Sequence, residues 1–261
     1  MTAYAQELEI VAGIARRAGD TALRYWRSGL TPDTKSDDSP VTIADRECER
    51  LIAASLDETF PEDGLFGEEG AAKPSRNGRR WIIDPIDGTR DFVRGNPMWA
   101  TFIGLEQDGE VVAGFVNFPA LGELVTAARG AGARINDNPI RASAATEITR
   151  SVLSLDSFNQ VGRYEWAARL NEFMRPFWAV RCFGGCYDAV LVARGMADLW
   201  IETSGQPWDF AALKIVAEEA GARFFSFAGR STIHDGNAVI CAPGLEKIAR
   251  EFVGCPQKVP D

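Results

Sequence analysis

The sequence has very few of the residues that build transition-metal sites and disulfide frameworks. Among its 261 residues there is one histidine, His234, and there are five cysteines, Cys48, Cys182, Cys186, Cys241 and Cys255. A single histidine excludes a multi-histidine metal centre. The spacing of Cys182 and Cys186 predicts neighbouring turns of one helix, and no second Cys or His pair is present to complete a zinc site. An odd cysteine count in a chain too large to need disulfides favours a reducing compartment.

The sequence also lacks the features of membrane, secreted and nucleic-acid-binding proteins. No apolar run approaches the roughly 18 residues of a membrane-spanning helix. Residues 1–9 have neither the basic start nor the apolar core of a secretory signal. The 28 Lys and Arg against 37 Asp and Glu give a net charge of −9, which disfavours binding to a phosphate backbone. We therefore expect a cytoplasmic protein without a membrane or nucleic-acid partner.

What remains is ordinary globular composition, with 46% hydrophobic and 25% charged residues, which excludes disorder and fibrous repeats. In the first part of the chain, apolar periodicity predicts helices over 8–25 and 42–56, joined by a polar loop at 31–40. Trp81–Ile83 predicts a short buried strand that ends at Asp84-Pro85. The Asp108-Gly109 pair predicts a hairpin between strands at 100–105 and 111–118, and residues 124–128 continue the antiparallel pattern.

Strands and helices alternate in the second part of the chain. The pattern predicts strands at 152–155, 197–201, 224–227 and 238–241, and helices at 164–173, 187–194, 208–220 and from about 245. Such alternation is typical of layered α/β packing. We place the boundary between the two halves near residue 145, so that residues 1–145 form the N-terminal half and residues 146–261 the C-terminal half.

The most informative segment is Asp84-Pro85-Ile86-Asp87-Gly88-Thr89, directly after the predicted strand. Pro85 fixes the backbone between the two acids, so that both carboxylates and the Ile86 carbonyl can converge on one point. Gly88 permits close backbone approach, and a short helix opening beyond Thr89 would offer free amide groups to an anion. These are the components of a magnesium–phosphate site, because Mg²⁺ takes few, hard oxygen ligands from protein and completes its shell with water and phosphate.

Each acid also has an ordinary structural interpretation. An Asp-Gly pair such as Asp87-Gly88 most often forms a tight turn, and Asp209 at the start of an apolar helix is a good N-cap. Glu68, in the glycine-flanked run 67–70, is by itself typical of solvated surface. Taken together, Glu68, Asp84, Asp87 and Asp209 predict one oxygen-ligand cluster. Metal ions bound there would explain how an acidic protein handles a phosphate.

The segments around these acids resemble, in order, the signatures of the inositol monophosphatase family. The matching segments are Gly67-Glu68-Glu69, Trp81 to Thr89 with Phe92, Trp208 to Ala212, Glu219-Ala220-Gly221, and the earlier Lys35, Asp37, Val41-Thr42 and Ala44-Asp45. This combination is highly specific and spans nearly the whole chain. The resemblance implies an α/β (α+β) chain with a layered α/β/α/β/α fold, usually a homodimer, that hydrolyses small phosphate monoesters with two or three Mg²⁺ per active site.

The resemblance also implies a role for each motif residue. The first metal would be held by Glu68, Asp84 and the Ile86 carbonyl, and the second by Asp84, Asp87 and Asp209. The backbone amides of Gly88 and Thr89 would bind phosphate, and Asp45 would orient the attacking water together with Thr89.

The expected chemistry follows from the reaction. Monoester hydrolysis is very slow without a catalyst, and its loose transition state leaves the protein mostly positioning and charge stabilisation to supply. We expect direct in-line attack by a water activated by two metal ions. Glu68 and Thr89 would accept or relay the proton of that water, and no phosphoenzyme is needed.

Fewer residues indicate which ester is hydrolysed. The run from Arg94 to Thr101 resembles the Arg-Gly-x-Pro-x-Trp-Ala-Thr of the histidinol-phosphate phosphatase branch, although its Trp99 is equally typical of a core aromatic. Gly185, near which that branch usually carries Asp, and the acid Asp188 match inositol-type members better. The resemblance places Glu202 beside the organic part of the substrate, with Asp188 nearby. A carboxylate there would bind the amine of histidinol phosphate by a charge-assisted hydrogen bond, and it would also accept inositol hydroxyls.

We predict a Mg-dependent histidinol-phosphate phosphatase, with inositol-1-monophosphatase or a broad-specificity small-molecule phosphatase as open alternatives. A reading from another class is a non-catalytic module that binds metal or a partner protein, and the intact set of acids argues against it. In the enzyme reading the cysteines and His234 are structural. Residues 35–40 are the predicted mobile loop.

Overall fold

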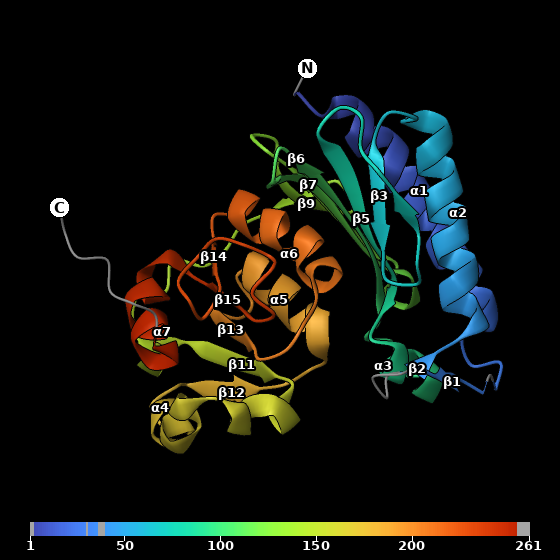
Figure 1. The fold of residues 1–261 in the computed structure, drawn as a ribbon. Helices are drawn as coiled ribbons and strands as arrows, with labels where there is room; N and C mark the ends of the chain where they lie inside the picture. The colour runs from blue at the N-terminus through green and yellow to red at the C-terminus, as the bar shows by residue number, and fades with distance from the viewer. Residues whose placement is uncertain (1–2, 30, 36–39, 255–261) are drawn as a thin grey trace.

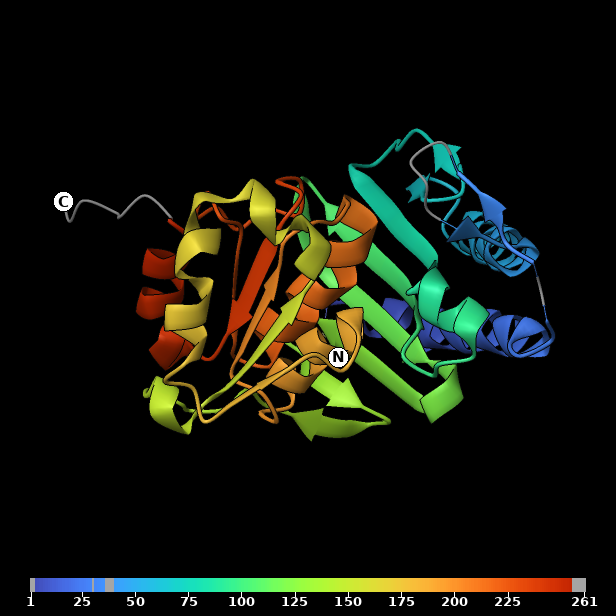
Figure 2. The same cartoon turned by 90° about the horizontal axis from the view of Figure 1, so that it is seen from below.

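The computed structural model describes residues 3–29, 31–35 and 40–254, and these form five layers (Figures 1 and 2). Helices α1 (Ala5–Tyr25) and α2 (Ile43–Thr59) cover the outer face of a large sheet. Helices α5 (Gly185–Ala193) and α6 (Pro207–Glu219) lie between this sheet and a smaller one. Helices α4 (Leu170–Met174) and α7 (Glu246–Val253) pack outside the smaller sheet. The predicted α/β/α/β/α layering is confirmed.

The large sheet has eight strands in the order β10-β9-β8-β7-β6-β5-β3-β4, and only its β3–β5 pair is parallel. Its strands are β3 (Gly64–Gly67), β4 (Ala72–Lys73), β5 (Arg79–Asp87), β6 (Ala100–Gln107), β7 (Glu110–Phe118), β8 (Glu123–Ala128), β9 (Gly132–Ile135) and β10 (Asn138–Ile140). The predicted hairpin joins β6 to β7, and both turn residues, Asp108 and Gly109, have positive φ, as a two-residue hairpin turn requires. Helix α3 (Thr89–Arg94) follows β5 directly.

The smaller sheet has five strands in the order β12-β11-β13-β15-β14. Its strands are β11 (Val152–Asp156), β12 (Ala179–Arg181), β13 (Leu199–Glu202), β14 (Arg223–Phe225) and β15 (Ala238–Cys241). Strand β11 is parallel to both β12 and β13, whereas β15 is antiparallel to its neighbours. The 3₁₀ helices among the described residues are η1 (Pro119–Leu121), η2 (Ile148–Arg150), η3 (Phe158–Arg163), η4 (Glu165–Arg169) and η5 (Pro243–Leu245).

A two-stranded ribbon, β1 (Asp33–Thr34) with β2 (Pro40–Val41), lies beside α3 (Figure 1). Residues 36–39 of the predicted mobile loop, including Asp37, lie outside the described residues, and so does Cys255. Among the residues that the structure describes, no helix is long and apolar enough to cross a bilayer. Residues 141–147, around the predicted boundary between halves, carry neither helix nor strand.

Three sequence-based expectations were wrong in detail. Strand β5 does not end at Asp84-Pro85 but continues to Asp87, because the proline sits in a bulge of the ladder, where no backbone N–H is needed. Residues 164–173 form a 3₁₀ helix, η4, followed by the short α4 rather than one helix. Cys182 precedes α5, so it does not share a helix with Cys186.

The central helix α6 packs very closely on the large sheet, through two glycines. A Cβ placed on Gly104 of β6 would lie 2.7 Å from the Cβ of Ala211, and one on Gly114 of β7 would lie 2.5 Å from Cγ2 of Ile215. The absence of side chains at these two positions lets the backbone of the sheet approach the helix. Because α6 also carries Asp209, this contact sets the position of that acid relative to the large sheet.

The close contact generates a prediction. Replacing Gly114 by Ala should lower the free energy of unfolding by about 1–3 kcal/mol, because the added methyl group overpacks the interface with α6. The matched control is Gly13→Ala, since Gly13 is an exposed interior residue of α1 with nothing near its missing Cβ. That change should stabilise the protein by up to about 1 kcal/mol. Urea unfolding measures both, and equal effects of the two substitutions would contradict the proposed role of Gly114.

Candidate active site

A β-bulge brings the two aspartates of β5 together. Asp84 pairs with Phe102 and Asp87 pairs with Ala100, so two residues of β5 lie opposite the single residue Thr101 of β6. In a regular strand, residues three apart point to opposite faces, and the extra residue of the bulge reverses this. The Thr101 hydroxyl donates to the Pro85 carbonyl at 2.9 Å and fixes the bulge. Oxygens of Asp84, Asp87 and Asp209 consequently lie within 4.8 Å of one another.

Asp209 is held by the start of α6. It occupies the third helical position, not the N-cap, and its Oδ2 accepts a hydrogen bond from the backbone N–H of Gln206 at 2.6 Å. Pro207 at the first helical position suits this helix start, because the missing N–H would have no partner there. The capping arrangement leaves the second carboxylate oxygen of Asp209 available to the cluster.

Glu68 follows β3 in a loop that is fixed by a buried acid of α2. The carboxylate of Glu49 accepts the backbone N–H groups of Glu69 at 2.8 Å and Ala71 at 2.7 Å. A Cβ on Gly67 would collide with this carboxylate, so only glycine fits between them. The ammonium of Lys35 donates to Glu68 at 2.8 Å and to Glu69 at 2.5 Å. The resemblance had pointed to Lys35, whereas Glu49 was missed, because an acid within a helix gives no sequence signal of this kind.

Asp45 and Thr89 form a connected pair at the start of two helices. Oδ2 of Asp45 accepts the N–H and the hydroxyl of Thr42, the N-cap of α2, at 2.7 and 2.6 Å. Its Oδ1 lies 3.4 Å from the Thr89 hydroxyl, which also lies 3.1 Å from the Ile86 carbonyl. Gly88 precedes Thr89 with φ of +80°, in the left-handed region that favours glycine. Thr89 has one hydroxyl proton and two acceptors within reach.

One polar cavity of about 500 Å³ joins most of the predicted residues. Its walls include Glu68, Asp84, Ile86, Asp87, Gly88, Thr89, Gly185, Glu202 and Asp209. Asp45 and Asp188 are fully buried and do not line it. Asp188 instead accepts the N–H groups of Phe183 and Gly184, at 2.9 and 3.2 Å, in the loop that precedes Gly185. Asp188 therefore lies behind the cavity wall that it was predicted to share.

The collected carboxylates raise one another's pKa. Desolvation is the main cause for Asp84 and Asp87, followed by the charge of Glu68 for Asp84 and of Asp209 for Asp87, and both pKa values are raised well above the ordinary range. Desolvation also raises the pKa of Asp209 to about 7 and that of Asp45 to about 6. Each added negative charge thus costs more than the previous one, and a bound cation would remove that cost.

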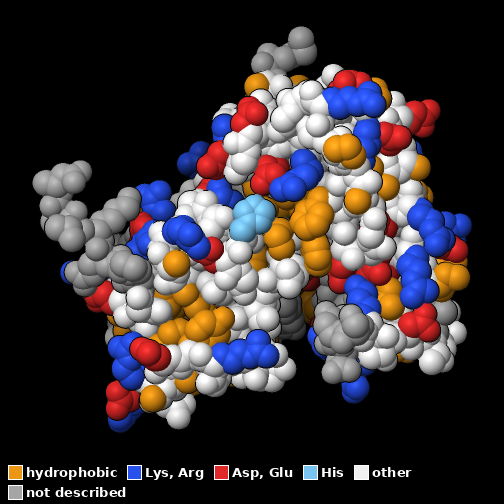
Figure 3. All heavy atoms as spheres, in the orientation of Figure 1, with side chains coloured by type: hydrophobic (Ala, Val, Ile, Leu, Met, Phe, Trp, Pro, Cys, Tyr) orange, Lys and Arg blue, Asp and Glu red, His pale blue; other side chains and the backbone are white. Residues whose placement is uncertain are grey.

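The donor set fits a hard divalent cation. The donors are carboxylate oxygens and one backbone carbonyl, which Mg²⁺ prefers over nitrogen or sulfur ligands. Carboxylates with raised pKa values, packed within 4.8 Å of one another, are stabilised by positive charge placed between them. His234, by contrast, lies at the surface (Figure 3), half exposed, with Nε2 3.6 Å from Glu106. The metal-binding roles of the acids remain predictions.

The cavity wall that was predicted to contact the substrate is built on the smaller sheet. Glu202 at the end of β13 is 8% exposed, and desolvation raises its pKa to about 8. Asp156, at the end of β11, also lines the cavity and was missed, because it follows an apolar strand without any motif. Desolvation raises its pKa to about 6.

Trp99 is a fully buried core residue that packs edge-on against Phe92, with ring centroids 4.9 Å apart.

Comparison with known proteins agrees with this geometry. The family model described as "Inositol monophosphatase family" matches residues 4–257. The chain belongs to the inositol monophosphatase family. It is therefore a phosphatase, a phosphoric monoester hydrolase. The solved Thermotoga maritima IMPase is similar with a TM-score of 0.86 at 28% identity, over 95% of this chain and 97% of that one.

Two curated relatives of this chain carry different names. A histidinol-phosphatase of Chlorobaculum parvum is 41% identical over 237 residues, covering 90% of this chain and 92% of the relative. An inositol-1-monophosphatase of Mesorhizobium japonicum is 32% identical over 258 residues, covering 96% of both chains.

The buried carboxylates predict an unusual pH dependence of stability in metal-free protein. The folded state raises the pKa of Glu202 from 4.5 to about 8, so between these values the folded state binds the proton more tightly than the unfolded state. The free energy of unfolding should therefore fall as the pH rises through this window. Glu202→Gln should remove this component and make chelator-treated protein more stable than wild type by roughly 1–3 kcal/mol at pH 8.5, but not at pH 4.5. Urea unfolding at both pH values measures the difference.

The control for this measurement is Glu62→Gln, because Glu62 is exposed and pairs with Arg76 at the surface. It removes the same charge from a solvated position. A Glu202→Gln gain that is equal at both pH values, or that Glu62→Gln reproduces, would contradict the assignment of the pH dependence to buried Glu202.

Proposed function

We propose that this phosphatase is Mg²⁺-dependent and that it hydrolyses histidinol phosphate to histidinol and phosphate. The observation that carries the metal dependence is the single cavity lined by Glu68, Asp84, Asp87 and Asp209. These acids come from β5, from the loop after β3 and from the start of α6, and they repel one another. Glu68, Asp84 and the Ile86 carbonyl would hold one Mg²⁺, and Asp84, Asp87 and Asp209 a second. When bound, the two ions would supply positive charge to the attacking water and to the leaving oxygen.

The protein's own residues would then orient the reactants. The phosphate would lie against the backbone amides of Gly88 and Thr89, where α3 begins. The Thr89 hydroxyl can donate to the Ile86 carbonyl or to Asp45. As it passes its own proton to Asp45, its oxygen would accept a proton from a water placed for in-line attack; alternatively, Glu68 would accept the proton of that water directly. Thr42 fixes Asp45 through two hydrogen bonds, and the other carboxylate oxygen of Asp45 in turn orients the Thr89 hydroxyl.

The identity of the ester rests on two observations. The relative named histidinol-phosphatase is more similar, at 41% identity, than the one named inositol-1-monophosphatase, at 32%. The substrate side of the cavity also presents Glu202 and Asp156, which suits an ester whose organic part is a cation. Inositol 1-phosphate hydrolysis, or a broad specificity, remains the second candidate, since carboxylates also accept hydroxyl groups.

One test of the proposed mechanism concerns Thr89. Replacing Thr89 by Ala removes the hydroxyl that links the attacking water to Asp45, so kcat should fall by about 10²–10⁴-fold. Thr89→Ser keeps the hydroxyl and should lose at most about tenfold. Steady-state phosphate release measures both variants. Equal losses in Ala and Ser would show that the methyl group, not the hydroxyl, is what the site requires.

A test of the proposed substrate and metal is a phosphate-release panel on wild-type protein. Histidinol phosphate should be hydrolysed with a kcat/KM at least about tenfold above that of inositol 1-phosphate. Activity should vanish after removal of divalent cations by a chelator and return with Mg²⁺. The reverse substrate order would favour the inositol reading. Full activity in the presence of chelator would contradict the metal site.

A further inference from the structure

Two carboxylates lie side by side on the substrate wall of the cavity because of strand register. Strands β11 and β13 are parallel, and Asp156 pairs directly with Glu202. The intervening residues Leu155 and Ile201 point the other way, into the core outside the smaller sheet. Paired residues of adjacent strands point to the same face, so both acids face the cavity.

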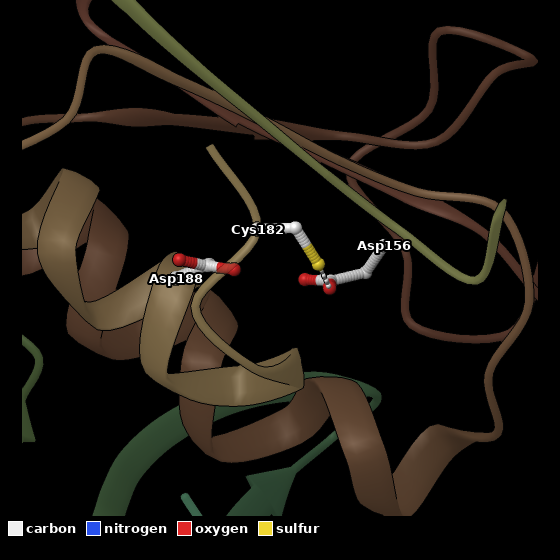
Figure 4. Close-up of side chains that lie close together, drawn as sticks. All are labelled: Asp156, Cys182 and Asp188. Carbon is white, nitrogen blue, oxygen red and sulfur yellow. Dashed lines mark hydrogen bonds between the residues drawn. The ribbon is translucent and has the colours of Figure 1, made fainter. Parts of the chain in front are cut away.

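Asp156 is held in a fixed orientation by two uncharged donors. The indole N–H of Trp200, two residues before Glu202 on the same face of β13, donates to Oδ2 of Asp156 at 2.6 Å. The thiol of Cys182 donates to its Oδ1 at 3.3 Å (Figure 4). Neither donor carries charge, so both orient the carboxylate without neutralising it. A carboxylate that is 5% exposed and pairs with no Lys or Arg among the described residues is costly in the absence of a ligand.

The described residues place no side-chain cation at this end of the cavity. Among the residues described as lining it, Arg90 is the one Lys or Arg, and it adjoins Thr89 at the start of α3, where the phosphate is proposed to bind. The nearest charged neighbour shown in Figure 4 is another acid: Asp188, behind the cavity wall, has a carboxylate oxygen within 4.8 Å of one of Asp156. Bound Mg²⁺ would be balanced by its own carboxylate ligands and the phosphate. The pair Asp156–Glu202 would still lack a counter-charge.

We propose that Asp156, together with Glu202, binds an ammonium group in the organic part of the substrate and makes the enzyme selective for phosphate esters of amino alcohols. This inference rests on the proposed function and adds to it a specificity-determining residue. An ammonium near both carboxylates would form charge-assisted hydrogen bonds with them and supply the missing counter-charge. A polyol donates only neutral hydroxyl groups, which satisfy lone pairs but supply no counter-charge that would stabilise the ionised pair.

The test compares the two classes of ester in one protein. For wild type and Asp156→Asn, kcat/KM is measured with histidinol phosphate, which carries the ammonium, and with glycerol 1-phosphate, which does not. Asp156→Asn keeps the shape of the side chain and removes its charge. We expect the ratio of the two kcat/KM values to fall by at least about tenfold, and Glu202→Gln to lower it in the same direction. Calorimetric titration with histidinol alone should show about tenfold weaker binding to Asp156→Asn.

The control variant is Asp57→Asn, which removes the same charge from an exposed position on α2, where Asp57 pairs with Lys73. It should leave the ratio unchanged. If Asp156→Asn does not fold, Asp156→Ser makes the same comparison with a smaller neutral side chain. A ratio that stays constant while both esters slow equally would overturn the ammonium-binding role. Wild type that fails to hydrolyse histidinol phosphate at all would instead overturn the proposed function.

Discussion

Electrostatic repulsion between carboxylates in one cavity is the constraint on which the rest of this site depends. Carboxylate oxygens of Asp84, Asp87 and Asp209 lie within 4.8 Å of one another in a desolvated site. Desolvation and repulsion by neighbouring carboxylates raise the pKa values of all three. The fold must therefore fix the position of each carboxylate against this repulsion. The bulge of β5 holds two of them, the start of α6 holds the third, and Glu49 holds the loop of Glu68. The bulge adds no charge, and the start of α6 holds Asp209 through a backbone N–H, whereas Glu49 holds its loop with a further buried carboxylate.

Helix starts contribute to the site in a second way. Asp45 and Asp209 both occupy the third position of a helix and both accept the backbone N–H of the residue before it. A carboxylate used in this way has one oxygen committed to the helix and one free for chemistry. The same interaction that begins the helix therefore orients the functional group, and the electropositive helix N-terminus favours its negative charge. Local secondary structure and function are in this sense one requirement.

The sequence contained enough information for the layers and for the main acids, because both follow from local patterns. The hairpin at Asp108-Gly109, the amphipathic α1 and the alternation after residue 145 all depend on neighbours along the chain. The bulge at Pro85 was not predictable, since it depends on how β5 pairs with β6. Glu49 and Asp156 were missed for a related reason. Their roles come from contacts with residues far away in the sequence, Ala71 and Trp200, and no spacing rule reports such contacts.

The glycine contact between α6 and the large sheet separates two tasks that one cavity performs. Through Gly104 and Gly114 the sheet is docked on α6 nearly backbone to backbone, so the acids of the sheet and of the helix that are proposed to bind cations form one frame. Asp156 and Glu202 stand outside this frame, on the ends of β11 and β13. In the proposed mechanism, substitutions there would change which alcohol is released without displacing the acids proposed to hold the metal ions. Such modular construction lets a single scaffold exchange one leaving group for another while its reaction stays the same.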